Sequence, residues 1–133
     1  MPADSPQQLS SEFAAAINGG DIDAALELWI EDALIIAPDG QALRGLDAIG
    51  RSLRALIENE AKVSVHVEEL FSAGDVALAV GALTMSGVGD DGERYEQRSS
   101  SAVIYCRGAD GGWRLAIDAP WGLPGAELRS AGL

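Results

Sequence analysis

Asp118 is the residue of this sequence best suited to chemistry, because it is a lone acid in an apolar strand. The segment 111–122 begins at two glycines, alternates in side-chain character, and ends at Pro120 and Trp121. Such alternation predicts a half-buried strand. A buried carboxyl group resists ionisation, so its pKa rises toward the range useful for proton transfer. Asp118 is therefore a candidate general acid or base. The alternative is a structural acid bonded to the turn that follows.

The remaining reactive side chains give weaker candidates. His66 is the only histidine and Cys106 the only cysteine, so neither a nucleophile triad nor a transition-metal site is supported. His66 is a possible acid or base by type, but its strand position predicts an outward-facing side chain opposite Gly81. Asp32 is placed at a helix-to-strand junction, which favours a structural role. We expect no metal and no cofactor.

The composition predicts one acidic globular domain. The chain has 133 residues, a formal net charge of −12 and a pI near 4.2. That charge disfavours binding to nucleic acid or to anionic membranes. The N-terminus lacks signal-peptide regions, and the lone cysteine fits a reducing compartment, so we expect a cytoplasmic protein. A single domain is predicted over 1–133, with a core at about 5–122 and a tail at 123–133.

The elements that must position Asp118 are helices first and strands afterwards. Ser5 and Asp21 are suited to cap two helices, the second of which is expected to carry Trp29 on its apolar stripe. A short strand pair is predicted over 33–44, and a third helix after Gly45. From residue 62 the apolar period changes from 3.6 to 2, which predicts four strands joined by short turns. The fold class is therefore α+β, with helices over one face of an antiparallel sheet.

The turns also predict which strand residues share a face. In this register Leu78 lies opposite both Glu69 and Ala102, and Ala102 lies opposite Asp118. The predicted aliphatic face carries Val63, Val65, Val67, Phe71, Val76, Leu78, Val80, Ala102, Ile104, Ala116 and Asp118. The predicted small-residue face carries His66, Ala77, Ala79, Gly81, Ser99, Ser101, Tyr105, Trp113, Leu115 and Ile117. A single β-bulge would exchange the faces along part of a strand.

The order of these elements, together with several local signatures, resembles a known family. The signatures are Asn18-Gly19-Gly20-Asp21, Trp29-Ile30-Glu31-Asp32-Ala33, Pro38-Asp39-Gly40, Arg44-Gly45, Ala73-Gly74-Asp75-Val76-Ala77, and Gly111-Gly112-Trp113-Arg114-Leu115 leading to Asp118. Over about 5–122 the chain resembles the SnoaL-like, ketosteroid-isomerase-like branch of the nuclear transport factor 2-like superfamily. The resemblance implies a cone-shaped α+β barrel, in which three helices and the concave face of a curved antiparallel sheet enclose an apolar pocket. It also implies a homodimer through the outer sheet face, which would be the small-residue face.

The resemblance further implies roles for individual residues. Asp118 is placed like the catalytic aspartate of SnoaL-type cyclases, and Trp29 and Trp121 would enclose a ligand. Arg98 is similar to an arginine of the epoxide-hydrolase members, although Ser100 stands where a second acid would strengthen that likeness. The first helix carries Phe13 and lacks the tyrosine donor of the steroid isomerases. The expected ligand-binding residues are Trp29, Leu78, Arg98, Ala102 and Trp121.

Two functions remain open at this point. The first is acid/base catalysis by Asp118 on a small hydrophobic, carbonyl-bearing molecule, of the isomerase, cyclase or dehydratase type. The second is a non-catalytic ligand-binding or dimerisation module in which Asp118 is structural. The expected partners are a small hydrophobic molecule and a second copy of the chain.

Overall fold

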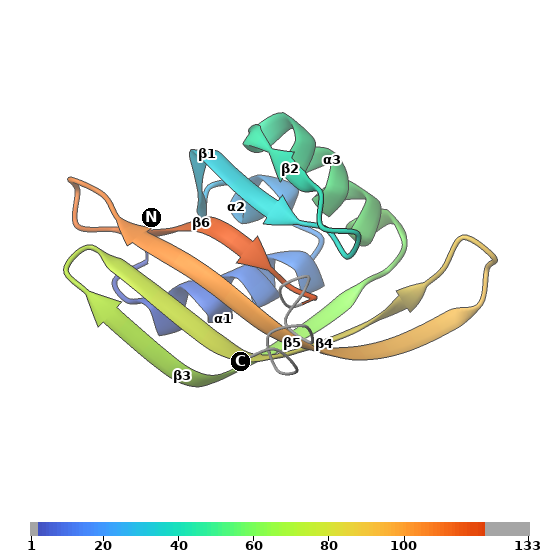
Figure 1. Cartoon of the computed structure of the whole chain (residues 1–133). Coiled ribbons are helices and arrows are strands. Elements are labelled where there is room, and N and C mark those ends of the chain that lie inside the picture. The colour runs from blue at the N-terminus through green and yellow to red at the C-terminus, as the bar shows by residue number, and fades with distance from the viewer. Residues whose placement is uncertain (1–2, 122–133) are drawn as a thin grey trace.

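The computed structural model describes residues 3–121 and shows an α+β fold, as predicted, with three helices and a six-stranded sheet (Figure 1). The helices are α1 (Pro6–Asn18), α2 (Ile22–Leu26) and α3 (Gly45–Glu58). The strands are β1 (Trp29–Ile36), β2 (Ala42–Arg44), β3 (Lys62–Ala73), β4 (Val76–Val88), β5 (Arg94–Arg107) and β6 (Trp113–Ala119). The predicted core boundary at residue 122 and the tail at 123–133 lie outside the described residues.

The helix starts follow the capping residues read from the sequence. The Ser5 hydroxyl accepts a hydrogen bond from the Gln8 amide at 3.1 Å, and the Asp21 carboxylate accepts one from the Ala24 amide at 3.1 Å. Each bond satisfies an amide that has no partner within its helix. The third helix begins differently, at Gly45, whose φ of +85° is a backbone conformation that favours glycine.

The sheet has the order β2-β1-β6-β5-β4-β3 (Figure 1). The predicted meander from β3 to β6 is antiparallel, and the β1–β2 hairpin joins the same sheet because β1 pairs in parallel with β6. The expectation that Trp29 lies on the apolar stripe of the second helix is wrong, because α2 ends at Leu26. Trp29 is the first residue of β1 and pairs with Leu115, and the parallel pairing also sets Ile35 beside Asp118.

A β-bulge in β3 exchanges the two faces of that strand. The register shifts between Val67 and Glu69, opposite Gly81 of β4. A Cβ atom at Gly81 would lie 1.9 Å from the carbonyl oxygen of His66, so the bulge requires glycine there. Before the bulge Val63 pairs with Met85; after it Phe71 pairs with Leu78. The prediction of one continuous aliphatic face along β3 is therefore wrong.

A second bulge, between β5 and β6, decides where Asp118 points. Tyr105 pairs with Leu115, yet Val103 pairs with Asp118, because β6 has one extra residue at this point. Leu115 and Asp118 consequently lie on the same face although they are three positions apart, which in a regular strand would place them on opposite faces. The predicted pairing of Ala102 with Asp118 is off by one residue, because Ala102 pairs with Ala119. Ala102 and Asp118 therefore lie on opposite faces of the sheet.

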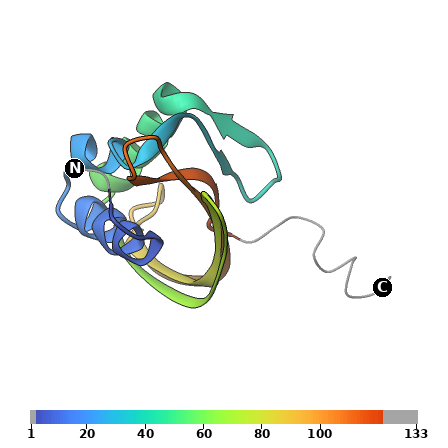
Figure 2. The same cartoon turned by 90° about the vertical axis from the view of Figure 1, so that its left-hand side faces the viewer.

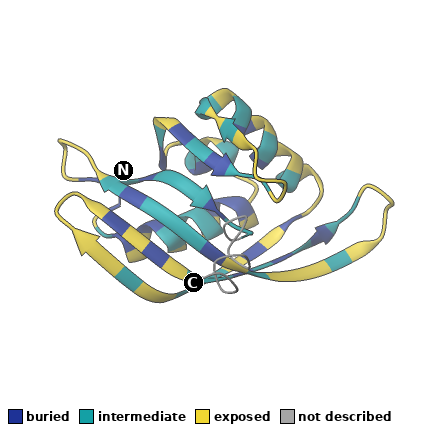
Figure 3. Ribbon diagram, viewed as in Figure 1, coloured by how far each residue is buried: buried dark blue, intermediate teal, exposed yellow. Residues whose placement is uncertain are grey.

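The sheet curls around an interior that α1 closes on one side (Figure 2). Buried and exposed residues alternate along the first half of β4, as expected for a strand with one covered face (Figure 3). Phe71, Val76, Leu78 and Val80 are large apolar residues left exposed. At the N-terminus Ala3 is fully buried, and its carbonyl accepts a hydrogen bond from the Trp113 amide at 2.9 Å.

Candidate active site

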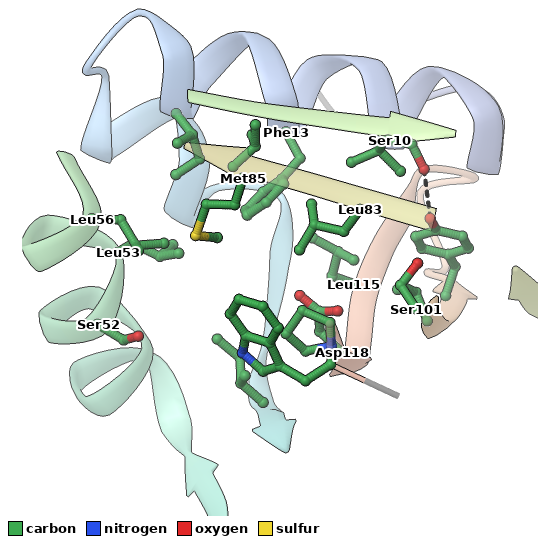
Figure 4. A pocket seen from close by; sticks show the side chains of 18 residues that line it. Ser10, Phe13, Ser52, Leu53, Leu56, Leu83, Met85, Ser101, Leu115 and Asp118 are labelled. Carbon is green, nitrogen blue, oxygen red and sulfur yellow. Dashed lines mark hydrogen bonds between the residues drawn. The ribbon is translucent and has the colours of Figure 1, made fainter. Parts of the chain in front are cut away.

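A cavity of about 140 Å³ lies between the concave sheet face and helices α1 and α3 (Figure 4). Its walls come from both helices and from all the strands except β2. The lining residues are Ser10, Phe13, Ile17, Ile35, Ser52, Leu53, Leu56, Val63, Val65, Leu83, Met85, Ser101, Val103, Tyr105, Leu115, Asp118, Pro120 and Trp121. Asp118 is the only residue among them with a carboxyl group.

Asp118 sits on the inner side of β6 between Ile35 of β1 and Val103 of β5. Within residues 3–121, no group forms a hydrogen bond to its carboxyl oxygens. Burial raises the pKa of Asp118 from its ordinary value of 3.8 to about 7. The side chain keeps partial accessibility because it faces the cavity. A carboxyl group in this state exchanges protons readily near neutral pH.

Tyr105 places a second titratable group on the cavity wall. Its side chain is only 2% exposed, and its hydroxyl lies 2.6 Å from the Ser10 hydroxyl of α1. Burial raises the pKa of Tyr105, the Ser10 hydrogen bond opposes that rise, and the negative charge of Asp118 adds to it. The phenol is therefore neutral and available as a hydrogen-bond donor or acceptor.

The polar groups of the cavity gather toward one end. Figure 4 shows Ser10, Ser101 and Asp118 on the side of β5 and β6, whereas Leu53 and Leu56 lie across the cavity on α3. Ser52 of α3 is a further hydroxyl, separated from that group in the same view. The cavity is thus apolar over most of its wall and polar at one end.

Aromatic packing supports the apolar part of the wall. The rings of Phe13 and Trp29 meet edge to face, with centroids 5.9 Å apart and planes at 75°. Trp29 is 3% exposed and does not line the cavity, whereas Phe13, which it contacts, does. Its indole Nε1 is buried without a hydrogen-bond partner among the described residues.

The structure brings two of the six predicted site residues to the cavity directly. Asp118 and Trp121 line it, and Trp29 packs behind it. The expectation that Leu78 and Ala102 face the same space is wrong: the two are on the convex face, where Leu78 pairs with Ile104 and Ala102 with Val80.

Arg98 and the other polar candidates also lie outside the cavity. Arg98 is exposed and pairs with Thr84 on the convex side of β5. Glu69 is exposed and lies opposite Val80 rather than Leu78. The outward position predicted for His66 is confirmed, although its partner is Ala82 rather than Gly81.

Tyr105, Ser101 and Leu115 line the cavity, so the prediction that they lie on the outer face is wrong. The three residues share one face, as predicted, but that face is the concave one rather than the convex one. Gly81, a glycine in the middle of an otherwise regular strand, is the sequence signal that could have indicated the first bulge. Ser10 was missed because its role depends on Tyr105, which is 95 residues away in the chain.

The described part of the chain offers neither a cluster of metal ligands nor a membrane-spanning helix. Over residues 3–121, no three His, Cys, Asp or Glu side chains are grouped closely enough to hold a metal ion. Among these residues, no helix has the length and apolar character needed to cross a membrane.

Comparison with solved structures reveals the same fold in several bacterial proteins. A Caulobacter vibrioides protein with a cystatin-like fold has a TM-score of 0.76 at 22% identity, over 95% of this chain and 93% of that chain. An NTF2-like protein from Novosphingobium aromaticivorans has a TM-score of 0.71 at 22% identity, over 94% and 84%. A ketosteroid isomerase-like protein from Erwinia carotovora atroseptica has a TM-score of 0.72 at 17% identity, over 85% and 89%.

The TM-scores establish a shared fold, and the low sequence identities leave the activity open. Among curated proteins, none matches this chain. The family model of the SnoaL-like domain matches residues 11–115, which run from within α1 to the beginning of β6. The chain therefore belongs to the SnoaL-like domain family and has an NTF2-like fold.

Proposed function

We propose that this protein is an acid/base catalyst of the ketosteroid-isomerase-like or cyclase-like kind, acting on a small hydrophobic molecule that carries a carbonyl group. The observation that carries the proposal is the state of Asp118, a carboxyl group facing an apolar cavity with a pKa of about 7. Such a group is poised to accept and return a proton at neutral pH. The fold shared with a ketosteroid isomerase-like protein is consistent with this chemistry.

The proposed step is proton transfer at the carbon next to the carbonyl. The Asp118 carboxylate removes a proton from that carbon, and the C–H electron pair moves into the carbonyl to form an enolate. The now neutral Asp118 returns the proton to the same carbon or to a conjugated one. Apolar surroundings favour the step because they remove the water that would otherwise stabilise the carboxylate.

Tyr105 is suited to hold the carbonyl oxygen during this step. The Ser10 hydroxyl lies 3.4 Å from the Pro6 carbonyl and 2.6 Å from the Tyr105 hydroxyl. If Ser10 donates to Tyr105, the phenol proton is free to point at a ligand oxygen. To donate to Tyr105, the Ser10 hydroxyl must give up its hydrogen bond to the Pro6 carbonyl, which is long and therefore weak. The Ser10–Tyr105 pair can thus supply a hydrogen-bond donor to the ligand at small energetic cost.

Exchange of carbon-bound hydrogen with solvent deuterium, followed by NMR, tests the proposal without the natural substrate. With cyclohexanone as probe, the protein should accelerate exchange at the carbons next to the carbonyl, and Asp118→Asn should abolish the acceleration. Asp32→Asn is the matched control, because Asp32 is exposed on β1 and outside the cavity wall. Equal exchange rates for the wild type and Asp118→Asn would refute the catalytic role.

A second function, ligand binding without catalysis, is favoured by a different observation. Apart from the neutral phenol of Tyr105, the lining residues give Asp118 no further acid, base or cation to complete a proton relay. In a binding module Asp118 would only hydrogen-bond the ligand. Cyclohexanone that binds with equal affinity to the wild type and Asp118→Asn, and exchanges no hydrogen on either, would support this function.

We also propose that the protein is a homodimer that uses the convex sheet face. Phe71, Leu78 and Ile104 lie side by side across β3, β4 and β5, and Val76 and Val80 extend the patch along β4. An exposed apolar patch of this kind is typical of an interaction surface, and a twofold arrangement buries the same patch on both copies. The mass in solution tests this: a dimer at micromolar concentration that Phe71→Asp converts to a monomer supports it. A monomeric wild type would refute it.

A further inference from the structure

Building on the proposed function, we propose that the cavity selects a neutral compound no larger than one substituted ring, bound with its single oxygen group toward Asp118, Ser101 and Tyr105. The inference comes from the size of the cavity, from the charges of its wall, and from the one-sided placement of its polar groups. It excludes fused-ring ligands and ions, and so narrows the substrate class considerably.

The cavity volume sets the upper limit on the ligand. The space of about 140 Å³ is close to the roughly 150 Å³ apolar cavity that is known to hold one benzene molecule. A second fused ring would need the walls to move. Leu53, Leu83, Met85 and Leu115 are all at most 7% exposed and belong to the packed hydrophobic core. Densely packed walls resist such displacement.

The wall charges exclude ions of either sign. The lining residues include no lysine, arginine or histidine, so a carboxylate or phosphate ligand would find no positive partner. The Asp118 carboxylate would add repulsion, as would the net charge of −12. A cation could pair with Asp118, but both charges would then have to leave water for an apolar wall, which offsets the attraction. A neutral molecule avoids these penalties.

The polar groups determine how the molecule lies. Ser101 is 8% exposed, Tyr105 2%, and both belong to the wall that also holds Asp118. A ketone oxygen or hydroxyl group at this end can satisfy these groups, whereas the hydrocarbon ring fills the space beside Phe13, Leu56 and Met85. A ligand with a second polar group at the opposite end would bury it against apolar side chains, apart from Ser52.

Isothermal titration of a small probe panel tests the inference on the wild-type protein. Phenol and cyclohexanone are the neutral one-ring probes, 2-naphthol is the two-ring probe, and benzoate and benzylamine are the ionic probes at pH 7. We expect the neutral one-ring probes to bind at least about tenfold more tightly than each of the others, because the others lose contacts or leave a charge unpaired. Tighter binding of 2-naphthol, benzoate or benzylamine than of phenol would overturn the inference.

A pair of variants tests whether the cavity wall sets the limit. Met85→Ala removes volume from the concave side of β4, so it should raise the affinity for 2-naphthol by about tenfold relative to phenol. Leu78→Ala removes a similar volume from the convex side and should leave both affinities unchanged. Val65→Ala is a milder enlargement if Met85→Ala does not fold. The same gain in Leu78→Ala as in the cavity variants would contradict the inference.

The failure of this inference can be distinguished from failure of the proposed function. Selective binding of phenol and cyclohexanone without hydrogen exchange supports the size and charge limits and refutes catalysis. Hydrogen exchange that depends on Asp118 but extends equally to the fused-ring ketone 1-decalone supports catalysis and overturns the size limit.

Discussion

The two faces of β4 both carry apolar side chains, but they differ sharply in how far those side chains are exposed to solvent. Ala77 and Ala79, on the concave face, are 1% and 4% exposed, whereas their neighbours Val76 and Leu78, on the convex face, are 49% and 36% exposed. The larger side chains are therefore the more exposed ones. A prediction from side-chain size alone would place Val76 and Leu78 on the buried face and would be wrong. Burial depends on which elements cover a face and not only on how apolar that face is.

The cover on the concave face is helical, and it is held by specific contacts. The Ser10 hydroxyl of α1 bonds to Tyr105, and Leu53 of α3 lines the same cavity. On the convex face no described element packs over Phe71 or Val76. The contrast predicts that substitutions on the concave face change stability and the site, whereas those on the convex face change association.

The substitution with the largest expected effect is Gly81→Ala. Gly81 lies opposite the β3 bulge, which determines which β3 residues face the interior. The added Cβ would lie 1.9 Å from a backbone oxygen, so the strand pairing must shift. We expect a loss of about 4 kcal/mol or more in unfolding free energy, or no folded protein. Gly92→Ala is the control: it has open space but a φ of +80°, and should cost about 1 kcal/mol. Urea denaturation compares the two, and equal losses would show that the bulge is not the cause.

Two leucines on the same strand test the contrast directly. Leu83 is 7% exposed on the concave face and Leu78 36% exposed on the convex face. Leu83→Ala should lower the unfolding free energy by about 3 kcal/mol, and Leu78→Ala by about 1 kcal/mol or less, since only the first leaves a buried cavity. Urea denaturation measures both losses, at a protein concentration low enough for the proposed dimer to be dissociated. A larger loss for Leu78→Ala would break the assignment of the faces.

The pH dependence of stability tests the environment of Asp118. The folded state raises the pKa from 3.8 to about 7, so it binds the proton more tightly than the unfolded chain does. The contribution of Asp118 is therefore most favourable at low pH and is lost as pH rises from about 4 to about 7, by about 1.4 kcal/mol per pH unit at most. Asp118→Asn should remove this slope, making the variant more stable than the wild type at pH 8. Parallel stability curves from pH 5 to 8 would show that Asp118 is solvated.

The smallest expected effect is that of Tyr105→Phe. The variant keeps the buried ring and loses the hydroxyl that bonds to Ser10 at 2.6 Å. We expect a loss of about 1 kcal/mol in unfolding free energy and a fall of about tenfold in the exchange rate with cyclohexanone. Ser10→Ala should reproduce much of the first effect and less of the second. An unchanged exchange rate in Tyr105→Phe would remove Tyr105 from the proposed step.

The sequence predicted the local features better than the assignment of faces. The caps at Ser5 and Asp21 depend on neighbouring residues, and they were predicted correctly. The turns were placed correctly in the chain, but the register predicted from them was off by two residues at Leu78, which pairs with Phe71 and Ile104 rather than with Glu69 and Ala102. The face of each strand depends on the two bulges, each of which shifts the pairing by one residue. Leu78 and Ala102 were misassigned for this reason, although Asp118 was still chosen correctly as a residue that faces the interior.

The contact between Ser10 and Tyr105 could not be predicted from either residue's neighbours. It depends on how α1 crosses the finished sheet, which is a property of the packed molecule. The same holds for Ile35, which reaches Asp118 only because β1 pairs in parallel with β6. These long-range contacts determine the shape and polarity of the cavity.

Asn18, at the end of α1, has a consequence for the free edge of the sheet. Its side-chain amide donates to the Val63 carbonyl at 2.9 Å and accepts from the Val63 amide at 2.7 Å, which imitates the pairing of a neighbouring strand. β3 is the outermost strand on that side, and unpaired edge groups invite another molecule to add a strand. Asn18 occupies the edge groups of Val63 from within the chain, so at this point of the edge another strand finds no free backbone groups to pair with.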